Sequence, residues 1–378
     1  MKAAGGQAWG VRDLRLDFFR GLSLFFIFID HIPENLLSYF TFRSVAFSDA
    51  AEVFIFISGF TAALVYGRSF EENGGLYATA QIYRRVWQLY VAHIFLFVIF
   101  TAEVSYTIFV VRNPMFTDEM GVGDFLETPH IAIIRTLFLG FQPNFLDILP
   151  LYIVLLMGFP LVLFLLRRNT LLTVALSALL YVGVQLFGWA PRTFPEHHSW
   201  FFNPLAWQFL FVFGAWYAAV GAIQLQAVLQ SKTAMALALL YLVFGFAVAM
   251  SWQFHGLEAM FPQQLVKLIY PIDKSSLSPL RLLHFMALAV VVARLLRHDW
   301  SGLMTPGMKA LIRCGENSLP IYCLSVPLAL LAHVALKEIS GGFAMQVAVS
   351  LAGIALMIAA ATLMTWTAKL DRHGPKLF

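Results

Sequence analysis

The chain has 378 residues, of which 60% are hydrophobic and only 12% are charged, and its mean hydropathy is +0.76. A soluble domain carries roughly 25% charged residues, so this composition excludes an ordinary soluble globular protein. The net charge of +4 does not indicate a nucleic-acid partner, because in a membrane protein the placement of Lys and Arg reports topology. We therefore expect a multi-pass protein in a lipid bilayer.

Apolar runs of about 20 residues, long enough to cross a hydrocarbon core, follow one another along the chain. They predict an all-α polytopic membrane protein with about ten transmembrane helices in a single integral-membrane domain, residues 1–378. Pro, Gly and charged clusters mark the turns. The predicted helices are 16–38, 50–67, 84–106, 146–166, 170–189, 203–222, 233–252, 279–298, 315–337 and 343–367.

The basic residues predict the orientation. With a cytoplasmic N-terminus, Lys and Arg divide roughly two to one in favour of the cytoplasmic side, as the positive-inside rule requires. Both termini are therefore predicted to be cytoplasmic. The first long outer loop, about 107–145, contains IAIIRTLFLGF. This stretch is too short to span and predicts a re-entrant or interfacial helix.

The first predicted helix carries a polar stripe within RGLSLFFIFIDH. Eleven residues advance an α-helix by about 20° beyond three full turns, so Arg20 and His31 share a face about 16 Å apart along the axis. Asp17 is a natural partner for Arg20 at three residues' spacing. A charge at membrane depth costs at least ~2.5 kcal/mol unless it faces the bundle interior or water. The stripe therefore predicts an interior polar site.

The next helix begins with SDAAEVFIFISGF and runs back across the membrane. Glu52 then lies level with His31, while Ser58 and Gly59 lie at mid-membrane depth. A histidine oriented by Glu52 or Asp30 is suited to general base catalysis. The alternatives are a polar helix–helix hydrogen bond and a proton relay. Gly59 either allows close helix packing or leaves room for a thin ligand.

Two outer regions add further candidates. SSLSPLRLLHF places Arg281 and His284 one turn apart near the outer end of the eighth predicted helix. His284 is either a site residue or a partnered histidine inside the bundle. PRTFPEHHSWFFNP, which contains Trp200, is either an interfacial aromatic belt or a platform for a sugar. The two cysteines show no metal-ligand spacing, and no metal site is predicted.

The motifs described above resemble those of a known protein family. Arg20-x10-His31 followed by the SGF tripeptide of the next helix resembles the transmembrane acyltransferase-3 superfamily. Six segments in order resemble its OpgC branch: RLDFFRGLSLFFIFIDH, DAAEVFIFISGF, DILPLYIVLL, NPLAWQFLFVFGA, SPLRLLHFMALA and GENSLPIYCLSV. They cover nearly the whole chain.

The resemblance implies an acyl-CoA-dependent O-acyltransferase of the bacterial inner membrane. OpgC-type proteins are associated with the succinylation of osmoregulated periplasmic glucans, so the implied donor is succinyl-CoA and the implied acceptor is a glucan. No permanently bound cofactor is expected. The functional arginine and histidine of the superfamily correspond to Arg20 and His31, and its SGF element corresponds to Ser58, Gly59 and Phe60.

On this basis we expect a passage through the bundle. Arg20, Arg84 and Arg85 would bind the coenzyme A phosphates, because guanidinium groups suit phosphate oxygens. The pantetheine arm would pass Ser58 and Gly59 and bring the thioester to His31, the general base.

At the outer side, the succinyl carboxylate needs a cation where it loses water, and Arg281 or Arg135 is the candidate. Trp200 and His284 are candidate glucan contacts. The rival predictions are an acyltransferase for another acyl group, another surface polysaccharide or a lipid, and a proton-coupled transporter. No two-fold sequence symmetry favours the transporter.

Overall fold

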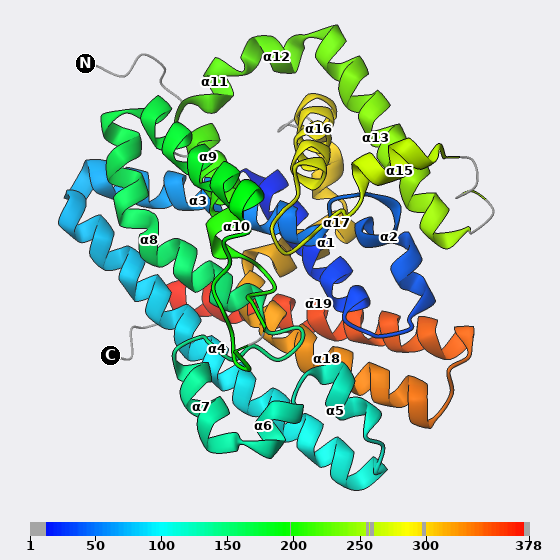
Figure 1. Cartoon of the computed structure of the whole chain (residues 1–378). Coiled ribbons are helices and arrows are strands. Elements are labelled where there is room, and N and C mark those ends of the chain that lie inside the picture. Colours follow the sequence, from blue (N-terminus) through cyan, green and yellow to red (C-terminus); the bar gives the residue numbers. More distant parts are fainter. Residues whose placement is uncertain (1–12, 197, 255–256, 258–260, 297–299, 374–378) are drawn as a thin grey trace.

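The computed structural model describes residues 13–196, 198–254, 257, 261–296 and 300–373 (Figure 1). Helices overlap all ten predicted segments, and the only β-structure in the described ranges is an isolated bridge between Arg192 and Ser199. The all-α polytopic membrane fold is therefore confirmed. Within these ranges, eight helical segments are long and apolar enough to cross a membrane: α3 (Ala50–Asn73), α4 (Gly75–Val111), α8 (Ile148–Arg168), α9 (Thr170–Phe187), Pro204–Gln224, α13 (Lys232–Gln253), α18 (Ser318–Glu338) and α19 (Phe343–His373).

Two further helices complete the predicted ten, α1 (Leu14–Asp30) and α16 (Pro279–Leu295), each of 17 residues. At 1.5 Å per residue each is about 26 Å long, slightly less than a hydrocarbon core. The segment Pro204–Gln224 consists of α10 (Pro204–Trp216), the π-helical turn η2 (Tyr217–Gly221) and α11 (Ala222–Gln224). The remaining elements are η1 (Leu36–Phe40), α2 (Phe42–Val45), α5 (Met115–Met120), α6 (Gly123–Glu127), α7 (Pro129–Leu137), α12 (Gln226–Gln230), α15 (Gln263–Ile269), η3 (Ser301–Met304) and α17 (Pro306–Glu316).

The first helix ends earlier than the predicted boundary at residue 38. Helix α1 stops at Asp30, and His31 is its C-cap. Pro33 explains the stop, because proline disfavours helical backbone at the preceding residue and cannot donate a helical hydrogen bond. The side-chain Oδ1 of Asn35 then caps η1 by accepting a hydrogen bond from the Leu37 N–H.

The third predicted helix, 84–106, is too short at both ends. Helix α4 has 37 residues and follows α3 after the single residue Gly74, whose φ is 86°. At about 55 Å it exceeds the thickness of a hydrocarbon core. Figure 1 shows it crossing one side of the bundle, with α5, α6 and α7 gathered at its far end. The short helix predicted in the first outer loop corresponds to α7.

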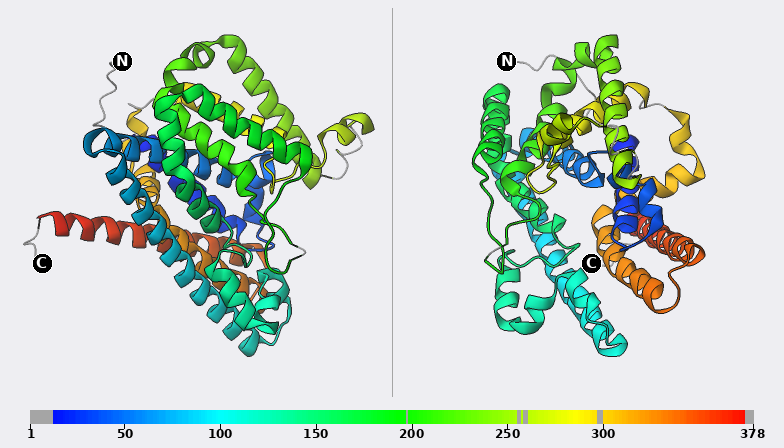
Figure 2. Two further views of the ribbon diagram at one scale, coloured as in Figure 1. Left: turned by 60° about the vertical axis from the view of Figure 1, so that its left-hand side comes forward. Right: turned by 45° about the vertical axis from the view of Figure 1, so that its right-hand side comes forward.

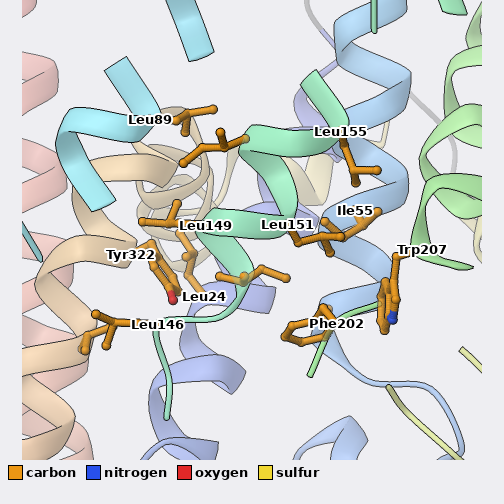
Figure 3. Close-up of a cluster of buried hydrophobic side chains, with 14 of the residues drawn as sticks. Leu24, Ile55, Leu89, Leu146, Leu149, Leu151, Leu155, Phe202, Trp207 and Tyr322 are labelled. Atoms are coloured by element: carbon orange, nitrogen blue, oxygen red, sulfur yellow. The ribbon is translucent and has the colours of Figure 1, made fainter. Parts of the chain in front are cut away.

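Helix α1 lies at the centre of the bundle. It packs most extensively on α17, and also on α3 and α18. Helices α12 and α13 pack on α16 and arch over one edge of the molecule (Figure 2). The buried cluster in Figure 3 joins Leu24 of α1, Ile55 of α3, Leu151 of α8 and Trp207 of α10. These contacts fix the relative positions of the helices that carry the polar residues.

Helices α3 and α10 cross through a pair of glycines. A Cβ atom added to Gly59 would lie 1.9 Å from the Phe211 carbonyl oxygen, and one added to Gly214 would lie 2.3 Å from that of Phe56. Small residues permit such backbone proximity between membrane helices. The packing interpretation of Gly59 is therefore the one the structure shows.

Candidate active site

Arg20 of α1 points toward α3. Its Nη2 donates a hydrogen bond to Thr61 Oγ1 at 2.8 Å, and its Nη1 lies 3.9 Å from Asp17 Oδ1. Arg20 and Thr61, together with Ser58 of α3 and Arg85 of α4, line a cavity of about 150 Å³. We call this the Arg20 cavity. No Asp or Glu is among the described residues that line it, so its cationic lining suits an anionic ligand.

His31 lines a second cavity, of about 360 Å³, which we call the His31 cavity. The described residues place no hydrogen-bond partner at its buried Nδ1. Its ring packs against Phe145, with the ring centroids 4.5 Å apart. Asp30, Asp147 and Lys274 line the same cavity. An imidazole with a free nitrogen beside a polar cavity has the arrangement that a general base needs.

A network of four charged residues borders the His31 cavity, and three of them, Asp49, Lys274 and Arg281, line it. Lys274 Nζ lies 2.7 Å from Asp49 Oδ2, and Arg281 Nη2 lies 3.2 Å from the same oxygen. Arg281 also binds Glu52 Oε1, at 2.7 Å from Nη2 and 2.8 Å from Nε. Two acids and two bases thus balance one another. Their pairing offsets the cost of removing each charge from water.

The same two acids begin α3. The Asp49 side chain accepts hydrogen bonds at the N-terminus of the helix, and Glu52 Oε2 accepts one from the Asp49 N–H at 2.8 Å. This reciprocal arrangement is a capping box. One sequence motif therefore both starts the helix and supplies the anionic half of the network.

The contacts of Glu52 differ from the predicted one. Its carboxylate binds Arg281 and the Asp49 N–H, and none of the hydrogen bonds of the described residues joins it to His31. Asp30 accepts a hydrogen bond from Thr41 Oγ1 at 2.6 Å. Asp30 shares the cavity with His31, whereas Glu52 lies behind the cavity wall.

The two cavities meet. Ile27 of α1, Ile148 of α8 and Tyr322 of α18 line both of them. The guanidinium and the imidazole predicted to share one face of α1 therefore lie in adjoining spaces, with a thin side-chain wall between them. A donor held in one cavity is next to a base in the other.

Several predicted contacts lie elsewhere. Gly59 faces the backbone of α10, as described above, and lines neither cavity. Arg84 is exposed on α4 and also lies outside both cavities. The Arg84 side chain points away because its neighbour Arg85 occupies the inward position, and adjacent helical residues differ by about 100°.

The outer-loop candidates are also separated from the His31 cavity. Arg135 of α7 lies 3.5 Å from Glu196, and half of its side chain is exposed. Trp200 is buried, and its neighbours Phe201 and Phe202 line the cavity in its place. Tertiary packing of the loop, which the sequence pattern does not contain, decides which aromatic residue faces inward.

Arg281 and His284 lie one turn apart on α16 but have different partners. Arg281 lines the His31 cavity but is held by two carboxylates. The His284 Nδ1 lies 2.8 Å from Ser48 Oγ, and its ring packs against Phe47. His284 thus matches the alternative interpretation of a partnered histidine inside the bundle.

The sequence analysis missed several residues of the His31 cavity, among them Arg43, Asp147, Lys274 and Tyr322. Asp147 and Tyr322 lie within DILPLYIVLL and GENSLPIYCLSV, two of the segments that carry the resemblance. That location was the available signal. Arg43 is exposed, and none of the ion pairs between described residues joins it to a carboxylate.

Burial shifts the pKa values of the groups just outside the helices. It lowers the pKa of His31, which follows the last residue of α1, to about 3, and Lys274 and Arg43 act in the same direction. Burial raises the pKa of Asp147 to about 6. It also opposes ionisation of Asp49, but Lys274 and Arg281 outweigh it and hold that pKa below its usual value. His31 is therefore neutral at pH 7.

A comparison with protein families matches residues 12–369 to the family described as OpgC protein. The chain belongs to the OpgC family. The match covers nearly the whole sequence and, with the apolar helices, identifies a multi-pass membrane acyltransferase of the OpgC type. Neither the curated proteins nor the solved structures contain a match.

Proposed function

We propose that this OpgC-type acyltransferase transfers a succinyl group from cytoplasmic succinyl-CoA to hydroxyl groups of a periplasmic glucan, in the bacterial inner membrane. The observation that carries the proposal is the pair of adjoining cavities, one with Arg20 and the other with His31. A thioester bound in the first has a short path to the base in the second.

The Arg20 cavity is the proposed donor site. Arg20 and Arg85 provide guanidinium groups for phosphate oxygens, and Ser58 and Thr61 provide hydroxyls along the wall. The axial separation of Arg20 and His31, about 16 Å, is comparable to an extended pantetheine arm. The phosphates therefore stay at one end while the acyl group reaches the other.

The His31 cavity is the proposed site of transfer. His31 accepts the proton of a glucan hydroxyl as that oxygen attacks the thioester carbonyl carbon. The carbon–sulfur bond breaks, and the proton passes to the departing thiolate. Burial lowers the pKa of His31, so the imidazole is neutral and able to accept a proton, but it is a weaker base than one whose pKa lies near the working pH.

The succinyl group carries a free carboxylate at the end opposite its thioester. We assign it to Arg43, in place of Arg281 or Arg135, because Arg43 lines the His31 cavity and no ion pair of the described residues neutralises it. Phe201 and Phe202 line the same cavity and supply apolar ring faces for a sugar.

The test uses purified protein in lipid nanodiscs with succinyl-CoA labelled in the succinyl group and a periplasmic glucan oligosaccharide. Acetyl-CoA is the comparison donor. We expect covalent label in the glucan, and a loss of about 10²- to 10⁴-fold in His31→Ala.

The matched control is His93→Leu. His93 is fully buried, and both of its ring nitrogens are unpartnered among the described residues, but it lines neither cavity. Equal transfer by wild type and His31→Ala would contradict the assignment of the base. Movement of substrate across vesicles without ester formation would favour the transporter instead.

A further inference from the structure

Among the described residues, one polar side chain lines both cavities. Of the three residues that line both cavities, Ile27 and Ile148 are aliphatic, and Tyr322 carries a phenolic hydroxyl. Tyr322 is 2% exposed, and Figure 3 shows its ring close to Leu24 and Leu149 at the centre of the bundle. A group that passes from the Arg20 cavity to His31 must therefore pass this ring.

The Tyr322 hydroxyl is connected to the wall around His31. It donates a hydrogen bond to the Phe145 carbonyl oxygen at 2.7 Å. The Phe145 ring in turn packs against His31. Phe145 has a φ of 72°, a left-handed conformation that is unfavourable for a residue with a Cβ atom. The surrounding structure thus holds this carbonyl beside the phenol despite its conformational cost.

The transfer step requires a hydrogen-bond donor near the wall between the two cavities. When a hydroxyl attacks a thioester, negative charge develops on the carbonyl oxygen, and a positioned hydrogen-bond donor lowers the barrier. The acyl carbonyl must lie near the wall between the cavities if its thioester comes from the Arg20 side and its base is His31. The phenolic O–H is the donor that this shared wall provides.

We propose that Tyr322 is a catalytic residue: the acyl end of the donor displaces the Phe145 carbonyl from its hydroxyl, which then donates to the thioester carbonyl oxygen. This inference rests on the proposed function. The acceptor oxygen forms a bond to the carbonyl carbon, and the π pair moves to the oxygen held by Tyr322. The pair then returns, the carbon–sulfur bond breaks, and the thiolate takes the acceptor's proton from His31. The products are an ester and free coenzyme A.

The experiment compares Tyr322→Phe with Tyr181→Phe. Tyr181 is also buried, and its hydroxyl donates to the Leu277 carbonyl oxygen at 2.8 Å, but it lines neither cavity. Both variants therefore lose one phenol–carbonyl hydrogen bond. Rates are measured as succinyl transfer to the glucan and divided by the number of sites that bind a non-reactive thioether analogue of succinyl-CoA, so unfolded protein is not counted.

We expect Tyr322→Phe to lower kcat by about 10²- to 10³-fold, with the donor KM changed by less than about twofold and Tyr181→Phe close to wild type. Transfer by Tyr322→Phe at the wild-type kcat, or a rise in KM alone, would overturn the role of Tyr322 and leave the proposed function intact. Absence of ester from wild type itself would instead remove the proposed function.

Discussion

The Arg20 cavity and the His31 cavity are built by opposite means. The first combines two arginines with neutral hydroxyl groups, and no Asp or Glu is among the described residues that line it. The second is bordered by a network in which two acids and two bases neutralise one another. The first arrangement presents guanidinium groups to the cavity, whereas the second presents a neutral imidazole. Binding and proton transfer therefore use different electrostatic designs within one bundle.

The largest expected loss of stability comes from removing one member of the charge network beside the His31 cavity. Arg281→Ala leaves Glu52 buried without its guanidinium partner, which typically costs about 3–5 kcal/mol. We expect a large loss of thermal stability in detergent, measured as the midpoint of unfolding. Arg135→Ala, which removes a half-exposed partner of Glu196, is the control and should cost at most about 1 kcal/mol. Equal midpoints for the two variants would show that the network is not structural.

The helix that carries Arg20, α1, is positioned by close backbone contact with α17. A Cβ at Gly315 of α17 would lie 1.8 Å from the Asp17 carbonyl oxygen of α1. Gly315→Ala should therefore push these helices apart and destabilise the protein by about 1–3 kcal/mol. Gly67→Ala, in α3 with nothing near the added Cβ, should be neutral or stabilising by up to about 1 kcal/mol. Thermal unfolding of both variants tests the contrast, and a neutral Gly315→Ala would contradict it.

A smaller effect is expected on donor binding, and it distinguishes binding of the donor from the transfer step. Arg20→Ala removes the proposed phosphate contact from the Arg20 cavity but leaves His31 in place. We expect the donor KM to rise about tenfold, equivalent to about 1.4 kcal/mol, while kcat at saturating donor falls less. Arg168→Ala, at the end of α8 and outside both cavities, should leave KM unchanged. A fall in kcat alone would place Arg20 in the chemical step.

The smallest expected change is in the pH profile of transfer. Burial lowers the pKa of His31 to about 3, so the imidazole stays deprotonated from pH 8 to pH 5.5. An ordinary histidine, with a pKa near 6.5, would lose about tenfold in active base at pH 5.5. We expect kcat to change less than about twofold. The pH profile is measured in the Asp147→Asn variant. Burial raises the pKa of Asp147 to about 6, and this substitution removes its titration from the measured range. A tenfold fall in that background would mean that His31 titrates normally.

Hydropathy was sufficient to predict the ten helical segments, because a hydrocarbon core requires long apolar helices whatever their neighbours are. Helical periodicity predicted that Arg20 and His31 share one face, and the structure places Arg20 of α1 and its C-cap His31 on two adjoining cavities. The errors at helix ends came from local features such as Pro33 and Gly74, which act at single residues and are weak signals in an apolar window.

Packing alone decided the rest of the site. Glu52 was predicted to orient His31, but its carboxylate binds Arg281 of the distant α16. Tyr322 lies in an apolar helix, α18. It lines both cavities because α18 packs beside the α1 and α8 residues that line them too. Pairings between residues that are hundreds of positions apart depend on how helices cross. A sequence determines such crossings only through the whole set of its contacts.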